Sequence, residues 1–143
     1  MRAVVMSMKP KWWEKILTRE KTMEIRKTMP RGGAGGTEPW PMLVLVYVSG
    51  TGEIQGQFLC GGWVKTNLLA GMEKQSCVPL RDLVEYAGGP GGSLCGWIVK
   101  DPRKYEVPRK LEEFGLTRPP MSWQYVEIEN GVDADGKQQS AEH

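Results

Sequence analysis

The 143-residue sequence is poor in histidine and cysteine, the side chains that most zinc sites and many catalytic centres use. Its one histidine, His143, is the last residue, and its three cysteines, Cys60, Cys77 and Cys95, have no Cys-x-x-Cys spacing. A zinc site is therefore not expected, and neither is a Ser–His or Cys–His nucleophile pair. We expect no metal and no cofactor, and we expect the cysteines to be reduced side chains that pack in the interior.

Long apolar runs are also missing. None approaches the ~20 residues that a membrane-spanning helix needs, and the first residues lack a secretory pattern. We therefore expect a cytoplasmic protein with no membrane partner. With 40% hydrophobic and 25% charged residues, the composition is typical of a globular protein. Residues 131–143 are polar, so we expect a single, monomeric domain at residues 1–130 followed by a disordered tail.

The net charge of +2 hides an uneven distribution. Residues 1–31 hold nine Lys or Arg and three Glu, whereas residues 127–143 hold five acidic residues and one Lys. The basic segment favours contact with phosphate groups, although such segments also occur as plain solvated surface. Charge alone leaves both interpretations open.

Residues 9–26, KPKWWEKILTREKTMEIR, predict a short amphipathic helix that leads directly into a strand. Pro10 suits a first helical turn, and an apolar face follows at the helical period. That face consists of Trp12, Trp13, Ile16 and Leu17. Strand alternation then places Glu24 and Arg26 on one face and Lys21 on the other. Glu24 and Arg26 can form a surface ion pair without function, or they can bind a ligand.

Five other segments have the short apolar or alternating patterns of strands, and one has the pattern of a helix. The strands are expected at residues 2–8, 42–48, 53–65, 94–100 and 122–129, and the helix at 79–87. We expect Asp101 and Pro102 to end the strand before them, and residues 105–116 to plug one end of a barrel. Because strands outnumber helices and mostly follow one another in pairs, the sequence predicts an α+β fold built on a small mixed β-barrel of five to six strands.

Two other features have ordinary interpretations. The glycine-rich residues 32–36 lack the Gly-Lys-Ser/Thr ending of a phosphate-binding loop, so we interpret them as a flexible linker or lid. Trp12 and Trp13 are interpreted as core residues. The place of Trp123 stays open, because the extended residues 118–120 ahead of it can line an opening.

Four segments in order resemble the ASCH domain, a branch of the PUA-like superfamily, and in particular its small phage and bacterial members. The first comprises SMKP at residues 7–10 and ILTREKTMEIR at 16–26, which match the strand, short helix and Glu-x-Arg strand that open the family. The others are GQFLC at 56–60, GWIV at 96–99 and RPPMSWQYV at 118–126. The resemblance spans residues 1–129.

This resemblance implies a small β-barrel with two or more short helices capping its openings. It also implies binding of RNA or a nucleotide in a cationic cleft beside the Lys-x-x-Glu-x-Arg strand. The implied cleft residues are Lys9, Lys21, Glu24 and Arg26, with Arg118, Ser122 and Trp123 as an opposite wall. Cations for phosphate, a carboxylate for a base amino group and a tryptophan for stacking suit a nucleotide.

Some members of the superfamily are enzymes, so a small nucleic-acid-directed hydrolase is the alternative function. One branch resembles amidohydrolases that deacylate N4-acetylcytidine with a Lys, a Thr and a Glu, and another consists of ribonucleases. Lys21 matches the lysine, but Glu24 stands where the threonine is expected, and Thr22 is turned away from Lys21. Glu85 is a loose match for the glutamate. If the protein is an enzyme, Lys21 and Glu24 are its candidate catalytic residues; a non-catalytic protein-interaction module is a third possibility.

Overall fold

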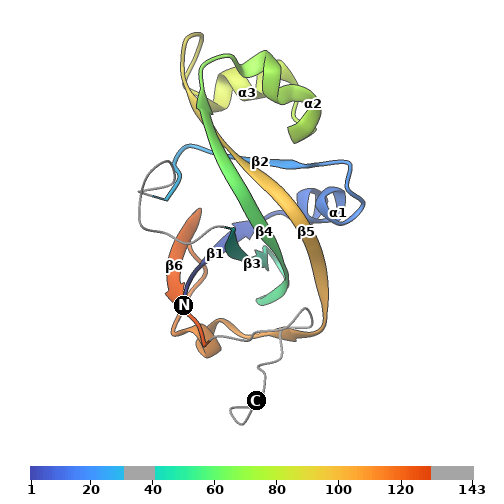
Figure 1. Cartoon of the computed structure of the whole chain (residues 1–143), viewed down its shortest axis with the longest axis vertical. Coiled ribbons are helices and arrows are strands. Elements are labelled where there is room, and N and C mark those ends of the chain that lie inside the picture. Colours follow the sequence, from blue (N-terminus) through green and yellow to red (C-terminus); the bar gives the residue numbers. More distant parts are fainter. Residues whose placement is uncertain (31–40, 130–143) are drawn as a thin grey trace.

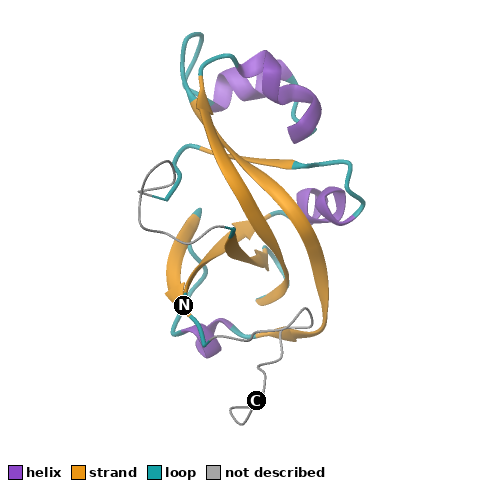
Figure 2. Cartoon of the chain, in the orientation of Figure 1, coloured by secondary structure: helices purple, strands orange, loops and turns teal. Residues whose placement is uncertain are grey.

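The computed structural model describes residues 1–30 and 41–129, and these residues form one mixed six-stranded sheet with short helices around it (Figures 1 and 2). The strand order is β2-β5-β4-β3-β1-β6. The strands are β1 (Arg2–Met8), β2 (Met23–Arg26), β3 (Met42–Val48), β4 (Glu53–Thr66), β5 (Leu94–Arg109) and β6 (Trp123–Glu127). The helices are α1 (Pro10–Leu17), α2 (Glu73–Ser76) and α3 (Leu80–Tyr86), with 3₁₀ turns η1 (Leu69–Met72) and η2 (Leu111–Phe114).

β1 and β3 run parallel, and every other neighbouring pair in the sheet is antiparallel. A parallel pair needs a long crossover, and here the crossover contains α1 and β2. β1 also pairs with β6, which places the beginning of the described chain beside its end. The predicted α+β fold is therefore confirmed, and its six strands agree with the predicted five to six.

The barrel is open along one line. β2 and β6 are the two outer strands of the sheet, and no backbone ladder joins them within the described residues. Instead, Arg26 of β2 donates hydrogen bonds to the carbonyl oxygens of Ser7 and Ser122, which lie at the end of β1 and just before β6. In a closed barrel, backbone hydrogen bonds would join the two outer strands; here the side chain of Arg26 makes the connection. We call this line the seam.

β3 is buried along its whole length, as its unbroken apolar run predicts. Alternate β3 residues enter two separate clusters, one on each face of the sheet. The first cluster includes Val44, Phe58 and Trp97 and packs against Trp13 and Ile16 of α1. The second is covered by η2 through Leu111, and its other members include Leu45 and Tyr105. A third cluster lies between β2, β5 and the helical segment from η1 to α3.

Some local predictions were wrong. Asp101 and Pro102 do not end the strand, because β5 continues through them to Arg109. The β4–β5 register shifts between the pairs Leu59–Lys100 and Gln57–Arg103, so Asp101 and Pro102 form a bulge, where a residue without an N–H and a positive φ of 49° are both tolerated. The expected plug residue Val107 is 57% exposed, since its segment belongs to this strand.

The helix at 79–87 is confirmed as α3, in which Leu80 is exposed and Leu83 is buried. The predicted linker or lid at residues 32–36 and the predicted tail at 131–143 lie outside the described residues. None of the helices in the described part of the chain is long and apolar enough to cross a membrane.

Candidate functional site

The candidate site is built on β2 and on the turn that leads into it from α1. Pairing of β2 with β5 sets Glu24 opposite Trp97 and Arg26 opposite Cys95, so both side chains point to one face, as predicted. Lys21, however, precedes the first residue of β2 and does not follow the strand alternation. Its backbone N–H donates to the carbonyl of Lys15, and this turn directs the lysine side chain toward Glu24.

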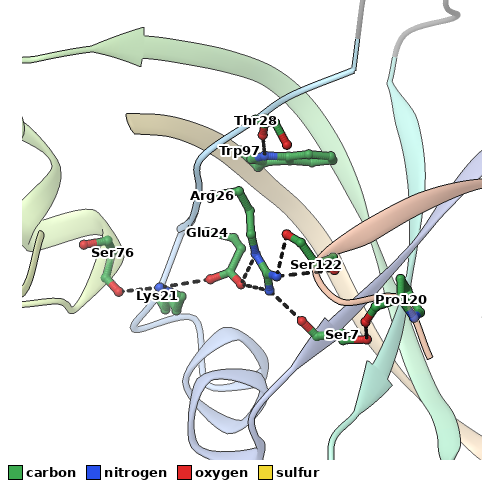
Figure 3. Close-up of polar contacts among 9 residues, drawn as sticks. All are labelled: Ser7, Lys21, Glu24, Arg26, Thr28, Ser76, Trp97, Pro120 and Ser122. Carbon is green, nitrogen blue, oxygen red and sulfur yellow. Dashed lines mark hydrogen bonds and ion pairs between the residues drawn. The ribbon is translucent and has the colours of Figure 1, made fainter. Parts of the chain in front are cut away.

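Lys21 is almost completely enclosed, with 1% of its surface exposed. Its ammonium group donates to the carbonyl oxygen of Ser76 at 2.6 Å and lies 3.3 Å from Oε1 of Glu24 (Figure 3). The same nitrogen lies 4.7 Å from the centre of the Trp12 ring. Burial lowers the pKa of Lys21 below its ordinary value of 10.5, and the carboxylate of Glu24 offsets part of that effect.

Arg26 binds the other carboxylate oxygen. Oε2 of Glu24 accepts from Nη2 of Arg26 at 2.6 Å and from Nε at 3.2 Å. Nη2 also donates to the carbonyl of Ser7 at 2.7 Å, and Nη1 donates to the carbonyl and hydroxyl oxygens of Ser122. All five N–H groups of the guanidinium have protein acceptors, so Arg26 binds the two sides of the seam together (Figure 3).

Thr28 makes a second connection across the seam. The indole N–H of Trp97, on β5, donates to the carbonyl oxygen of Thr28 at 3.2 Å. The indole N–H of Trp123, on β6, donates to the Thr28 hydroxyl at 2.8 Å. The rings of Trp97 and Trp123 meet edge to face, with their centres 5.4 Å apart. Trp123 therefore packs at the seam, which settles the position that the sequence left open.

A cleft of about 520 Å³ opens beside this network, between α1, β2 and α3. Four cations, two carboxylates, two aromatic rings and several apolar side chains line it. The lining residues are Ser7, Met8, Lys9, Lys11, Trp12, Lys21, Glu24, Ile25, Arg26, Ser49, Val78, Asp82, Leu83, Tyr86 and Met121. The cleft thus combines positive charge with aromatic and apolar surface, and Glu24 and Asp82 supply its carboxylate acceptors.

The structure brings together part of the implied site. Lys9, Lys21, Glu24 and Arg26 all line the cleft. Of the implied opposite wall, Ser122 touches them, through its bonds to Arg26. None of the three implied wall residues lines the cleft itself. Trp123 packs at the seam, and Arg118 is exposed outside the cleft.

Of the residues that the enzymatic alternative names, two lie together at the cleft and two lie apart from it. Lys21 and Glu24 are in contact at the edge of the cleft, which is the arrangement that the alternative needs. Thr22 is exposed, and its backbone groups pair with Gln75 and Val99. Glu85 is exposed on α3 and does not line the cleft. The described residues contain no group of three or more His, Cys, Asp or Glu side chains arranged to hold a metal ion.

Sequence reasoning missed the contribution of α3, and in the segment before β6 it missed Met121. Asp82 and Tyr86 line the cleft from α3, and Met121 lines it from the Arg-Pro-Pro-Met segment. Helical spacing alone groups Asp82 with Tyr86, four residues apart, on one face. Nothing in the sequence indicates that this face meets β2, because the contact depends on how the β4–β5 pair places α3.

The comparisons with known proteins support the fold. No family model matches the sequence, and no curated protein does. The solved structures that are similar include the ASCH protein from Zymomonas mobilis and two single-residue variants of it. Each has a TM-score of 0.70 and 15% or 16% identity, and each alignment covers 87% of this chain and 87% to 90% of the other. At this level of sequence identity, the similarity establishes a shared fold and nothing about function. The protein has the fold of an ASCH domain.

Proposed function

We propose that the protein binds RNA or a nucleotide in the cleft beside Lys21, Glu24 and Arg26. The observation that carries the proposal is the composition of the cleft, whose lining includes four cations and two carboxylates. A net positive lining attracts an anionic ligand such as a phosphate ester. The volume of the cleft, about 520 Å³, lies in the range of small-molecule binding sites and therefore suits a single nucleotide unit.

Different groups are suited to the two ends of a nucleotide. Lys9 and Lys11 are exposed at the start of α1 and are available to phosphate oxygens. Glu24 is 4% exposed and holds two cations. Oε2 already accepts two hydrogen bonds from Arg26, whereas Oε1 contacts Lys21 alone and retains a lone pair that can accept from the amino group of a base. Lys21 and Arg26 have their donors engaged, so they support Glu24 rather than contact phosphate.

A second function is favoured by one observation. Lys21 combines burial, a lowered pKa and contact with Glu24 at the edge of the cleft, and such lysines occur as acid–base groups in enzymes. Glu24 in place of a hydroxyl residue removes the nucleophile of the amidohydrolase mechanism. Binding is therefore the function that the cleft supports best, with a small hydrolase as the second candidate.

The test is binding of labelled single-stranded and hairpin RNA at two salt concentrations, with the double variant Lys9→Ala/Lys11→Ala. We expect the affinity of the variant to fall and its dependence on salt to become shallower, by a slope of about 0.7 for each lysine–phosphate interaction removed on a single strand. The matched control is Lys104→Ala, since Lys104 is exposed on β5 and does not line the cleft.

Several outcomes separate the candidates. Equal binding by the double variant and the Lys104→Ala control would refute the cleft as the phosphate site. Absence of RNA and nucleotide binding at low salt would refute the binding function. Incubation with an N4-acylated cytidine tests the hydrolase, because release of cytidine that is abolished in Lys21→Ala would establish it, and no turnover at high protein concentration would eliminate this amidohydrolase version.

A further inference from the structure

Met121 is the most exposed of the large apolar residues in the described chain, with a relative exposure of 105%. Single exposed apolar side chains are ordinary on protein surfaces, and most need no explanation. Of these exposed residues in the described chain, Met121 and Tyr86, at 41%, also line the cleft. Leu68, at 76%, and Val107, at 57%, are the next most exposed, and neither lines the cleft.

The backbone on both sides of Met121 is fixed by hydrogen bonds. The carbonyl oxygen of Pro120 accepts from the hydroxyl of Ser7 at 2.7 Å. The carbonyl oxygen of Ser122 accepts from the backbone N–H of Ser7 at 3.0 Å and from Arg26 at 3.3 Å. Figure 3 shows Pro120 and Ser122 meeting Ser7 and Arg26 at this point. The fold thus holds residue 121 at the edge of the cleft and leaves its side chain in water.

The aromatic rings that line the cleft already have partners. The ammonium groups of Lys11 and Lys21 lie 4.6 Å and 4.7 Å from the centre of the Trp12 ring. The ammonium group of Lys27 lies 4.8 Å from the centre of the Tyr86 ring. Stacking of a base on the face of either ring that a cation covers has to displace that cation–π contact first. Met121 offers apolar, polarisable surface without that cost, and thioether–aromatic contacts are favourable.

We propose that Met121 is the residue that packs on the base of the nucleotide bound in the cleft, and so a determinant of its affinity. The inference rests on the proposed function and deepens it. Lys9 and Lys11 hold the phosphate, Glu24 accepts from the edge of the base, and the Met121 thioether covers the face of the base. Arg26 is a positioning residue in this arrangement, because it holds both Glu24 and the backbone beside Met121.

The first measurement compares Met121→Ala, Met121→Leu and the unaltered protein in binding single-stranded RNA and the four nucleoside 5′-monophosphates. We expect Met121→Ala to weaken binding about threefold to tenfold, which lies within the range that sulfur–aromatic contacts give. Met121→Leu restores most of it, because it keeps the apolar volume. The salt dependence stays unchanged in both variants, since no charge is removed. Leu68→Ala is the matched control, an exposed apolar residue away from the cleft.

The second measurement follows binding to the unaltered protein, and a variant serves only to assign its spectrum. Methionine methyl groups are labelled with carbon-13, the Met121 signal is assigned from its absence in Met121→Leu, and adenosine 5′-monophosphate is added. A base over the thioether shifts the Met121 methyl signal by its ring current and leaves that of Met1, which does not line the cleft, in place.

Binding that saturates while the Met121 signal stays fixed, with Met121→Ala within twofold of the unaltered protein, would overturn the inference. The binding function would survive that result if Lys9→Ala/Lys11→Ala still bound RNA more weakly than the unaltered protein does. Failure of every RNA and nucleotide probe would overturn the function and the inference together.

Discussion

Glu24 is a single buried carboxylate shared by two buried cations. Its side chain is 5% exposed, and those of Lys21 and Arg26 are 1% and 11% exposed. Because burial removes the hydration of all three groups, each cation depends on this one carboxylate for charge compensation. The same geometry that makes Glu24 a candidate ligand residue therefore also makes it important for stability.

Replacing Glu24 with Gln is expected to lower the free energy of unfolding by about 3–5 kcal/mol, the cost of leaving buried charges without their partner. Urea denaturation of both proteins at neutral pH measures the difference. Glu127→Gln is the control, because Glu127 forms exposed ion pairs with Arg2 and the N-terminus that contribute about 0–1 kcal/mol. A destabilisation at Glu24 no larger than that at Glu127 would contradict the prediction.

Glu24 and Arg26 were predictable from sequence as neighbours, because period two alone puts them on one face. The third member was not. Lys21 was predicted on the opposite face, and it reaches Glu24 because the strand begins only at Met23 and the preceding turn redirects the lysine. The acceptor for its ammonium group, Ser76, is 55 residues away, a contact that no local pattern reveals.

At the scale of elements, α1 depends on a glycine in β4. A methyl group on Gly56 would overlap the backbone oxygen of Arg103 and the ring of Trp13, so α1 and β5 both approach β4 at the point where it has no side chain. The register of β4 with both neighbouring strands shifts at Gly56. The close contact with Trp13 could not be predicted, since it depends on how α1 lies across the sheet.

Gly56→Ala is expected to destabilise the protein by about 1–3 kcal/mol, the range for overpacking a tightly packed interior. Thermal and urea denaturation give the value. Gly71→Ala is the matched control, because a methyl group there meets nothing within 4 Å and its φ is not in the left-handed region. Equal stability of the two variants would show that α1 moves aside without cost.

The two longest strands show a further limit of local patterns. The alternation in residues 53–65 predicted β4 almost to its last residue. β5 was predicted to end at Lys100, because proline lacks the N–H that a ladder needs, and yet the strand continues to Arg109. The neighbouring strand β4 supplies the partners that carry β5 past the bulge, and that support is not visible in the sequence of β5 itself.

The molecule as a whole is a sheet whose two outer strands are joined by side chains. Arg26 and Thr28 connect β2 with the segments around β1, β5 and β6. Six strands of mixed direction were predictable from the number and order of apolar segments, and the resemblance implied the barrel. The seam was not predictable, because it depends on whether two strands far apart in sequence come close enough to form a ladder.

Arg26→Lys is expected to loosen the seam while it keeps a positive charge beside Glu24. A lysine has three donors at one point and cannot replace five donors that reach both Glu24 and two backbone carbonyls. Hydrogen exchange should therefore accelerate at Ser7, whose N–H donates to Ser122, and in the residues that follow Ser122. Arg109→Lys is the control, since its bonds to Glu113 are local. Unchanged exchange at Ser7 would show that the seam holds without the guanidinium.

The pairing of β1 with β6 has a consequence for how the protein is made. β1 is synthesised before the other strands of the sheet, and its backbone partners at one edge are residues 123–127. On the ribosome, β1 can pair with β3 as soon as that strand emerges, but its other edge stays open until β6 has left the exit tunnel. For most of the time in which the sheet is translated, the nascent chain therefore carries an exposed strand edge beside its most apolar strand, which is the kind of surface that chaperones bind.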